Sequence, residues 1–290
     1  MKVSGFSFIR NAIKYDYPIK EAILSILPIC DEFVIAVGKS EDETYNLIKS
    51  IDSVKLKIIE TVWNDNLRQG GKVLAEETNK ALKAISSDSD WAFYIQGDEV
   101  VHEKYLPVIQ QAMMQWKDDA KVEGLLLNYL HFYGSYDYVG DSRRWYRKEI
   151  RIIKPHPDIH SYKDAQGFRK RNKLIKVKQI DAYIYHYGWV KPPELQQAKQ
   201  KFFHKLWHDD KWIKNNIPDT DYFDYSQIDS LQHFKGTHPK VMLNRINEKN
   251  WFFSFDPTNR KNLKGLNKIL YWIEKKMNYR IGEYKNYKLL

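Results

Sequence analysis

The chain of 290 residues contains one cysteine and no long apolar run. The single Cys30 excludes an internal disulfide, and its apolar neighbours AILSILPIC favour a buried structural thiol. No stretch reaches the roughly 18 apolar residues that cross a bilayer. Arg10, Lys14 and Asp16 interrupt the first apolar residues, which is unlike a signal peptide. We therefore expect a protein of the reducing cytoplasm without a membrane span.

The composition is that of a globular protein with a basic surface. Hydrophobic residues make up 43% and aromatic residues 14%, which is enough for a sizeable core. The net charge of +10 favours phosphate-bearing partners, such as nucleic acid, anionic lipid or a nucleotide-linked substrate. The basic segment 168–178 is best interpreted as a solvated strand or loop, and no RNA-binding motif is present. Nucleic acid is therefore not an expected partner.

Short β-rich runs alternate with helical periods over the first 130 residues, which is typical of a parallel sheet with crossover helices. We predict strands at 3–9, 32–38, 56–62, 91–96 and 124–133. The helices predicted between them are 18–29, 42–52, 71–85 and 102–117. Ligands bind beyond the carboxyl ends of such strands. The segments 38–42 and 97–99 lie at two of these ends.

The later part of the chain contains a β-rich run at 180–189 and a helix near 194–209. The tail 263–277 is an amphipathic helix by its periodicity. Its apolar face comprises Leu263, Leu266, Ile269, Leu270, Ile273 and Met277, with Lys264, Lys268, Lys275 and Lys276 largely elsewhere. Packing against the core or a partner is the first interpretation. A basic helix lying on a membrane surface is the alternative.

Asp98 and Glu99 follow the strand WAFYIQ directly. Two carboxylates at the end of a buried strand need compensation for lost hydration. Mg²⁺ or Mn²⁺ would supply it, since these ions bind one or two carboxylates together with substrate phosphates. The alternative is that Asp98 forms a turn while Glu99 caps the next helix.

The order of segments resembles the family 2-like glycosyltransferases of the GT-A fold, of the type that builds bacterial cell-surface glycans. FIRNAIKYDYPIKEAILSILPICDEFVIAVGKSEDET is similar to their opening, GGKVLAEETNKALKAI to a following helix, and WAFYIQGDEVVHEKYL to the metal-binding strand. The resemblance covers 3–135 well and extends loosely to 208. It implies a Rossmann-like α/β fold with a mixed, mainly parallel sheet flanked by helices.

The same resemblance divides the chain. It implies a glycosyltransferase domain at 1–208, with a nucleotide-sugar half at about 1–100 and an acceptor half at about 101–208. The remaining residues, 209–290, form an aromatic-rich and mainly helical C-terminal extension.

The activity implied is the inverting, metal-dependent transfer of a sugar from a nucleotide-diphosphate donor to an acceptor hydroxyl. The implied setting is surface polysaccharide or lipopolysaccharide synthesis, with a glycan or lipid-linked acceptor and peripheral contact with the inner face of the membrane. The alternative is a non-catalytic carbohydrate- or nucleotide-binding relative of the same fold.

The resemblance also implies site residues. Asp98 matches the second acid of the family's DxD motif, while Gln96 replaces the first. The expected metal ligands are Asp98, Glu99 and His186, the last from YHYGWVKPPELQQAKQKFFHKLW. Donor binding is expected at Asp98 and at Asn11 and Asp42, which lie in the opening segment. Val37 stands where relatives carry an acid that contacts the nucleoside.

Basic side chains can share the charge of a leaving diphosphate. Arg68 and Lys72 flank Gly70 and Gly71 at a strand-to-helix junction, where backbone N–H groups also favour phosphate. We expect Arg68 and Lys72 to bind the donor. The alternatives are Arg143, Arg144 and Arg151.

An inverting transfer requires a general base, usually a carboxylate. Asp164 in HSYKDAQGF is the candidate and Asp158 the runner-up, with a plain loop role open for either. Trp145, Tyr146 and Trp189 are candidates for stacking on a sugar or base, with core packing as the alternative.

Overall fold

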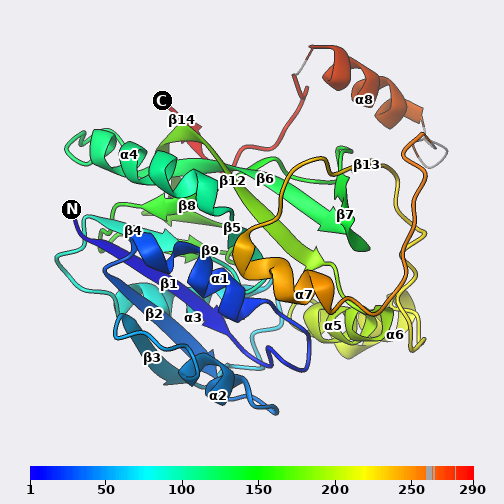
Figure 1. The fold of residues 1–290 in the computed structure, drawn as a ribbon, viewed down its shortest axis with the longest axis horizontal. Helices are drawn as coiled ribbons and strands as arrows, with labels where there is room; N and C mark the ends of the chain where they lie inside the picture. Colours follow the sequence, from blue (N-terminus) through cyan, green and yellow to red (C-terminus); the bar gives the residue numbers. More distant parts are fainter. Residues whose placement is uncertain (259–262, 264, 278) are drawn as a thin grey trace.

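The computed structural model describes residues 1–258, 263, 265–277 and 279–290. Its main sheet runs in the order β13-β7-β6-β8-β4-β1-β2-β3, and helices cover both faces (Figure 1). The first half is parallel and consists of β1 (Val3–Ile9), β2 (Glu32–Gly38), β3 (Leu56–Thr61) and β4 (Trp91–Tyr94). The helices α1 (Ile19–Ile26), α2 (Thr44–Lys49) and α3 (Lys72–Lys83) connect these strands. The expected mixed α/β fold is confirmed.

The second half of the sheet is largely antiparallel, with β12 running parallel to β6. Its strands are β5 (Glu99–Val101), β6 (Gly124–Tyr133), β7 (Ser135–Gly140), β8 (Lys148–Ile153) and β12 (Lys176–Trp189). A separate small sheet contains β9 (Ile159–Tyr162), β10 (Gly167–Lys170) and β11 (Lys173–Leu174). The longer helices here are α4 (Leu106–Trp116) and α5 (Pro193–Lys205). Short 3₁₀ turns occur at η1 (Leu27–Ile29), η2 (Glu103–Tyr105) and η3 (Lys240–Met242).

The central strands are apolar on both faces because both faces are covered. Along β2, Phe33 and Ile35 join one core cluster, whereas Val34 joins the other. Successive strand residues point to opposite faces, so a strand packed on both sides becomes a continuous apolar run. This burial fixes the positions of the strand ends that carry polar residues.

The segment 209–290 contributes strands as well as helices. It contains α6 (Asp210–Asn216), α7 (Leu243–Asn247) and α8 (Gly265–Met277). Two short strands extend the main sheet, since β13 (Leu231–His233) pairs with β7 and β14 (Lys288–Leu289) pairs with β12. The domain boundary at 208 stays a prediction. None of the described residues forms a helix with the length and apolar character that a bilayer crossing requires.

Candidate active site

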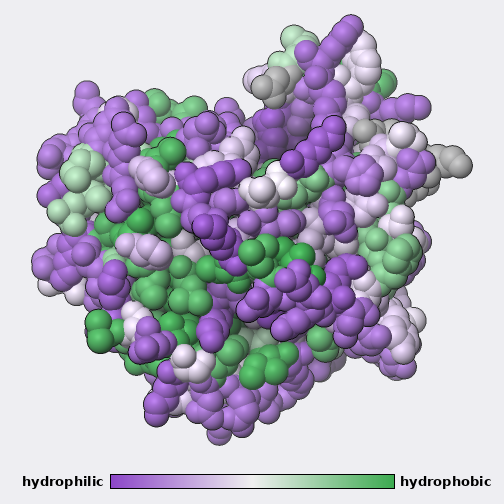
Figure 2. Space-filling view, viewed as in Figure 1, coloured by the Kyte–Doolittle hydropathy of each residue, from purple (hydrophilic) through white to green (hydrophobic). Residues whose placement is uncertain are grey.

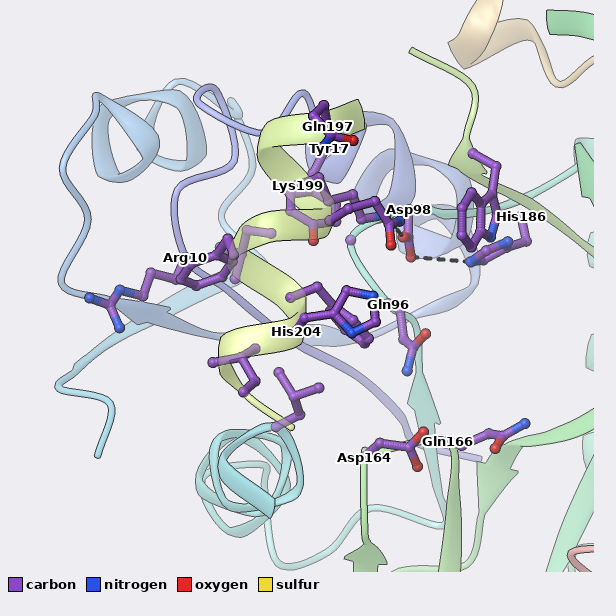
Figure 3. A pocket seen from close by; sticks show the side chains of 18 of the residues that line it. Arg10, Tyr17, Gln96, Asp98, Asp164, Gln166, His186, Gln197, Lys199 and His204 are labelled. Carbon is purple, nitrogen blue, oxygen red and sulfur yellow. Dashed lines mark hydrogen bonds and ion pairs between the residues drawn. The ribbon is translucent and has the colours of Figure 1, made fainter. Parts of the chain in front are cut away.

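A cavity of about 700 Å³ lies at the carboxyl ends of β1 and β4 and is bordered by α5 (Figure 3). Its polar lining includes three residues that the sequence singled out, namely Asp98, Asp164 and His186. The apolar lining includes Phe8, Trp63, Leu74, Phe203 and Leu206. The fold therefore brings together candidates that are up to 88 residues apart in the chain.

Strand pairing places Asp98 beside His186. The chain turns after β4, and β5 then pairs antiparallel with β12, so that Glu99 lies opposite His186. The Tyr187 backbone N–H donates to the carbonyl oxygen of Asp98 at 2.8 Å. In this register His186 Nε2 lies 3.7 Å from Asp98 Oδ1.

The close approach of these two side chains requires the glycine at 188. A Cβ at Gly188 would lie 2.6 Å from Asp98 Oδ2 and 2.7 Å from His186 Cε1. Both distances are shorter than van der Waals contact. Gly188 therefore leaves the room in which the carboxylate and the imidazole face each other.

Lys199 on α5 completes this cluster. Its ammonium donates to Asp98 Oδ2 at 3.0 Å and to the carbonyl oxygen of Gly188 at 2.9 Å. The ring of Tyr17 lies 4.8 Å from Lys199 Nζ and also 4.8 Å from Lys191 Nζ. Lys191 is fully buried and donates to the Tyr15 carbonyl at 2.7 Å. Two lysines thus converge from the segment that follows β12.

The electrostatics of the cluster favour an ionised Asp98. Burial alone would raise the pKa of Asp98, but Lys199, His186 and Lys191 outweigh it and hold that pKa well below its usual range. Burial lowers the pKa of His186, against the attraction of Asp98. Burial and the neighbouring Lys199 lower the pKa of Lys191 strongly. The Asp98 carboxylate therefore faces a fixed ammonium ion.

Glu99 is engaged elsewhere. It is fully buried, and Arg151 donates to both of its oxygens at 2.7 and 2.8 Å. The Tyr129 hydroxyl also donates to Glu99, at 2.7 Å. Of the three expected metal ligands, only Asp98 and His186 face one another.

A divalent cation held by protein side chains alone does not fit this donor set. Within the described part of the chain, no group of three or more His, Cys, Asp or Glu side chains could hold a metal ion. A dication at Asp98 would meet the ammonium of Lys199, which already contacts one carboxylate oxygen. The charge that Mg²⁺ or Mn²⁺ would provide is therefore opposed by a cation of the chain.

Asp164 lies between β9 and β10 and lines the same cavity. Burial raises its pKa, which makes its carboxylate a stronger base. Gly71, in the left-handed region with φ of 68°, passes so close that a Cβ there would lie 2.9 Å from Asp164 Cβ. Asp158 instead pairs with Arg171 at 2.6 Å and is not part of the cavity lining.

Asn11 and Asp42 connect the loop after β1 with the loop after β2. Asn11 accepts the Glu41 backbone N–H at 2.8 Å, and Asp42 accepts the backbone N–H groups of Lys14 and Thr44 at 2.7 and 3.0 Å. Neither side chain is part of the cavity lining. Their contacts in this structure hold the loop after β1 against the loop after β2.

Arg68 and Lys72 line a second pocket, together with Trp207 and Trp212. Arg68 pairs with Asp210 at 2.7 Å. Among the alternatives, Arg144 lines the main cavity, whereas Arg143 pairs with Glu274 and Arg151 with Glu99. Of the aromatic candidates, Tyr146 and Trp189 line the main cavity and Trp145 packs in a core cluster.

Lys199 and Lys191 are not among the site residues that the sequence predicts. Both follow the His-Tyr-Gly-Trp segment, Lys191 two residues after Trp189 and Lys199 one helical segment later. The sequence feature that could have indicated them is the lysine-containing helix that follows the segment around His186. Its meaning depends on the contact with Asp98, which lies 101 residues earlier.

No protein-family profile and no curated protein matches the chain. Among solved structures it is similar to TarS from S. aureus, with 17% identity, 70% of this chain covered and a TM-score of 0.43. The TarS 1–349 structure in complex with UDP has 16% identity, 69% coverage and a TM-score of 0.41. The chain spans 39% of the longer TarS chain and 64% of the 1–349 chain.

A further similar structure is glucosyl-3-phosphoglycerate synthase from Mycobacterium tuberculosis, in complex with Mn²⁺, UDP and glucosyl-3-phosphoglycerate. It shares 16% identity over 46% of this chain and 45% of its own, with a TM-score of 0.31. At these identities and TM-scores, the ligands and activities in the names of these structures are properties of those proteins. The function of this chain is therefore inferred from the residues that line its own cavity.

Proposed function

We propose that this protein is a glycosyltransferase that moves a sugar from a nucleotide-diphosphate donor to an acceptor hydroxyl. One observation carries the proposal. A single cavity joins a corner in which the ammonium of Lys199 pairs with Asp98 beside His186 to the carboxylate of Asp164. Such a cavity offers a counter-ion for phosphate and a base for a hydroxyl.

The donor occupies the cavity with its diphosphate at the Lys199 corner. Phe8, Trp63 and Phe203 supply apolar walls that a nucleoside or sugar ring can contact. Arg144 adds a further cation to the lining. A volume of about 700 Å³ lies within the range of small-molecule sites.

The reaction is one displacement at the anomeric carbon. Asp164 accepts the proton of the acceptor hydroxyl, the acceptor oxygen bonds to that carbon, and the bond to the diphosphate oxygen breaks with inversion. The negative charge that develops on the leaving diphosphate is met by Lys199. In Figure 3 Asp98 and Asp164 lie at separate ends of the pocket, and Gln96 lies between them.

The ammonium of Lys199 takes the charge-neutralising task that the sequence assigned to Mg²⁺ or Mn²⁺. It is a preorganised cation, fixed by Asp98 and the Gly188 carbonyl before any donor arrives. We therefore propose transfer without an obligatory divalent ion. A glycan or lipid-linked acceptor in surface polysaccharide or lipopolysaccharide synthesis is proposed by resemblance alone.

A panel of nucleotide-sugars tests this function. Released nucleoside diphosphate is measured for the wild type, Asp98→Asn and Asp164→Asn, with either Mn²⁺ or a chelator present. We expect turnover of at least one donor, survival of that turnover in chelator, and its loss in both variants. Binding without turnover across donors and acceptors would support the non-catalytic alternative, and absence of binding would overturn the proposal.

A further inference from the structure

The helix α8 exposes several of its apolar side chains. Its sequence is amphipathic, yet none of its residues is buried. Leu266, Ile269, Trp272 and Met277 are 68%, 59%, 60% and 69% exposed. In Figure 1 this helix projects from the body of the molecule at the upper right, and Figure 2 shows hydrophilic and hydrophobic residues together in that region. Such an arrangement is unusual, because an amphipathic helix normally buries its apolar stripe.

Polar contacts hold α8 in this orientation. The Tyr271 hydroxyl donates to Asp141 at 2.7 Å, and Glu274 pairs with Arg280 at 2.7 Å and with Arg143 at 3.3 Å. These partners lie on the loop after β7 and on the segment after α8. These side-chain contacts of the helix with its surroundings are polar, and its four most exposed apolar side chains face outward.

Lysines flank the exposed apolar side chains. Lys268 and Lys276 are exposed, and Lys276 Nζ lies 4.7 Å from the Trp272 ring centre. Lys275 reaches back to Asp141 at 3.5 Å. Apolar side chains, an interfacial tryptophan and flanking lysines are the features of a helix that lies in the plane of a membrane surface.

We propose that the exposed face of α8, formed by Leu266, Ile269, Trp272 and Met277 with Lys268 and Lys276, docks on an anionic lipid surface. Charge complementarity selects this occupant. A second copy of this chain would bring lysines against lysines within a protein of net charge +10. A nucleic acid would engage the lysines but leave the apolar side chains in water. An anionic bilayer meets both kinds of side chain at once.

The test is sedimentation of the full chain with vesicles of phosphatidylcholine, with and without phosphatidylglycerol. We expect binding to the anionic vesicles that weakens with added salt, since each lysine near such a surface contributes about fivefold. The variant Leu266→Ser with Ile269→Ser and Trp272→Ser should lose at least about tenfold in vesicle affinity. Lys268→Glu with Lys276→Glu should lose a similar factor.

A matched control uses an exposed apolar pair on another helix. Val108 and Met114 on α4 are 37% and 63% exposed, and Val108→Ser with Met114→Ser should leave vesicle binding unchanged. Circular dichroism melting confirms that each variant is folded. Absence of binding to anionic vesicles, or equal binding by wild type and the α8 variants, overturns the proposal. So does a wild-type dimer, measured by light scattering, that the α8 variants abolish in the absence of lipid binding.

Discussion

Asp98 and Glu99 are neighbours in the chain, and each pairs with a cation, but the two pairs differ in access to solvent. The Glu99–Arg151 pair is fully buried and satisfied on every carboxylate oxygen. The Asp98–Lys199 pair lines a cavity of about 700 Å³. Two adjacent carboxylates at a strand end can therefore have different roles, since Glu99 stabilises the fold and Asp98 faces the cavity.

The largest expected effect comes from breaking the buried pair. Arg151→Met leaves Glu99 without its cation, and removing one partner of a buried ion pair costs about 3–5 kcal/mol. The free energy of unfolding, measured by urea denaturation, should fall by that amount. Lys199→Met should cost clearly less, because Asp98 keeps access to the cavity. Equal losses in the two variants would remove the distinction between the pairs.

Breaking the Asp98–Lys199 pair in the cavity should lower turnover. Lys199→Met removes the cation that meets the leaving diphosphate, and we expect turnover to fall by about 100-fold or more. Lys201→Met is the matched control, since Lys201 on the same helix pairs at the surface with Asp219. Full activity of Lys199→Met, measured as nucleoside diphosphate release, would contradict the role of this ammonium.

A smaller effect is expected from the glycine that lets the pair form. In Gly188→Ala the new Cβ pushes against Asp98 Oδ2 and the His186 ring. We expect about a tenfold loss of turnover, because small misplacements at a reacting centre are costly. The folded state should persist in circular dichroism. Unchanged kinetics would show that the position of Asp98 tolerates the shift.

Glu149, a neighbour of the buried pair, should make the free energy of unfolding depend on pH. Burial raises the pKa of Glu149 to about 8, so the folded protein holds a proton that the unfolded chain releases near 4.5. This contribution to stability is present below pH 4.5 and is lost as the pH rises through about 8. In Glu149→Gln the fall in unfolding free energy between these pH values should shrink by about 1.4 kcal/mol for each pH unit. Parallel stability profiles for the two proteins would refute the shift.

The smallest expected effect is a shift in the pH dependence of kcat/KM, caused by the proposed base Asp164. Because burial raises the pKa of Asp164, the acidic limb of kcat/KM should lie above the usual range of an aspartate. Activity should be lost as the pH falls through that raised pKa. A limb at the ordinary value would assign the base to another group.

Much of the fold is readable from local pattern. The strands expected at 3–9, 32–38 and 124–133 have these bounds in the structure, because their apolar runs are bounded by turn-forming or polar residues. The strand expected at 180–189 begins earlier, at Lys176, where pairing with β6 extends it despite its lysines.

The site was only partly predictable. Asp98, His186 and Asp164 do share one cavity, but the partners that decide the states of the two acids lie far away in sequence. Lys199 reaches Asp98 across 101 residues, and Arg151 reaches Glu99 across 52. Tertiary pairing of this kind leaves no trace in the spacing of residues near the motif. The expected metal ligand Glu99 thus turned out to be paired with an arginine.

The most direct test of the central claim is a double-mutant cycle on Asp98 and Lys199. Asp98→Asn, Lys199→Met and the double variant are compared with the wild type by nucleoside diphosphate release from the best donor, in the presence of a chelator. We expect wild-type turnover without metal and a double variant no worse than the poorer single variant, because the two residues act as one unit. Wild-type turnover that vanishes in chelator, together with independent, multiplicative losses in the variants, would contradict it.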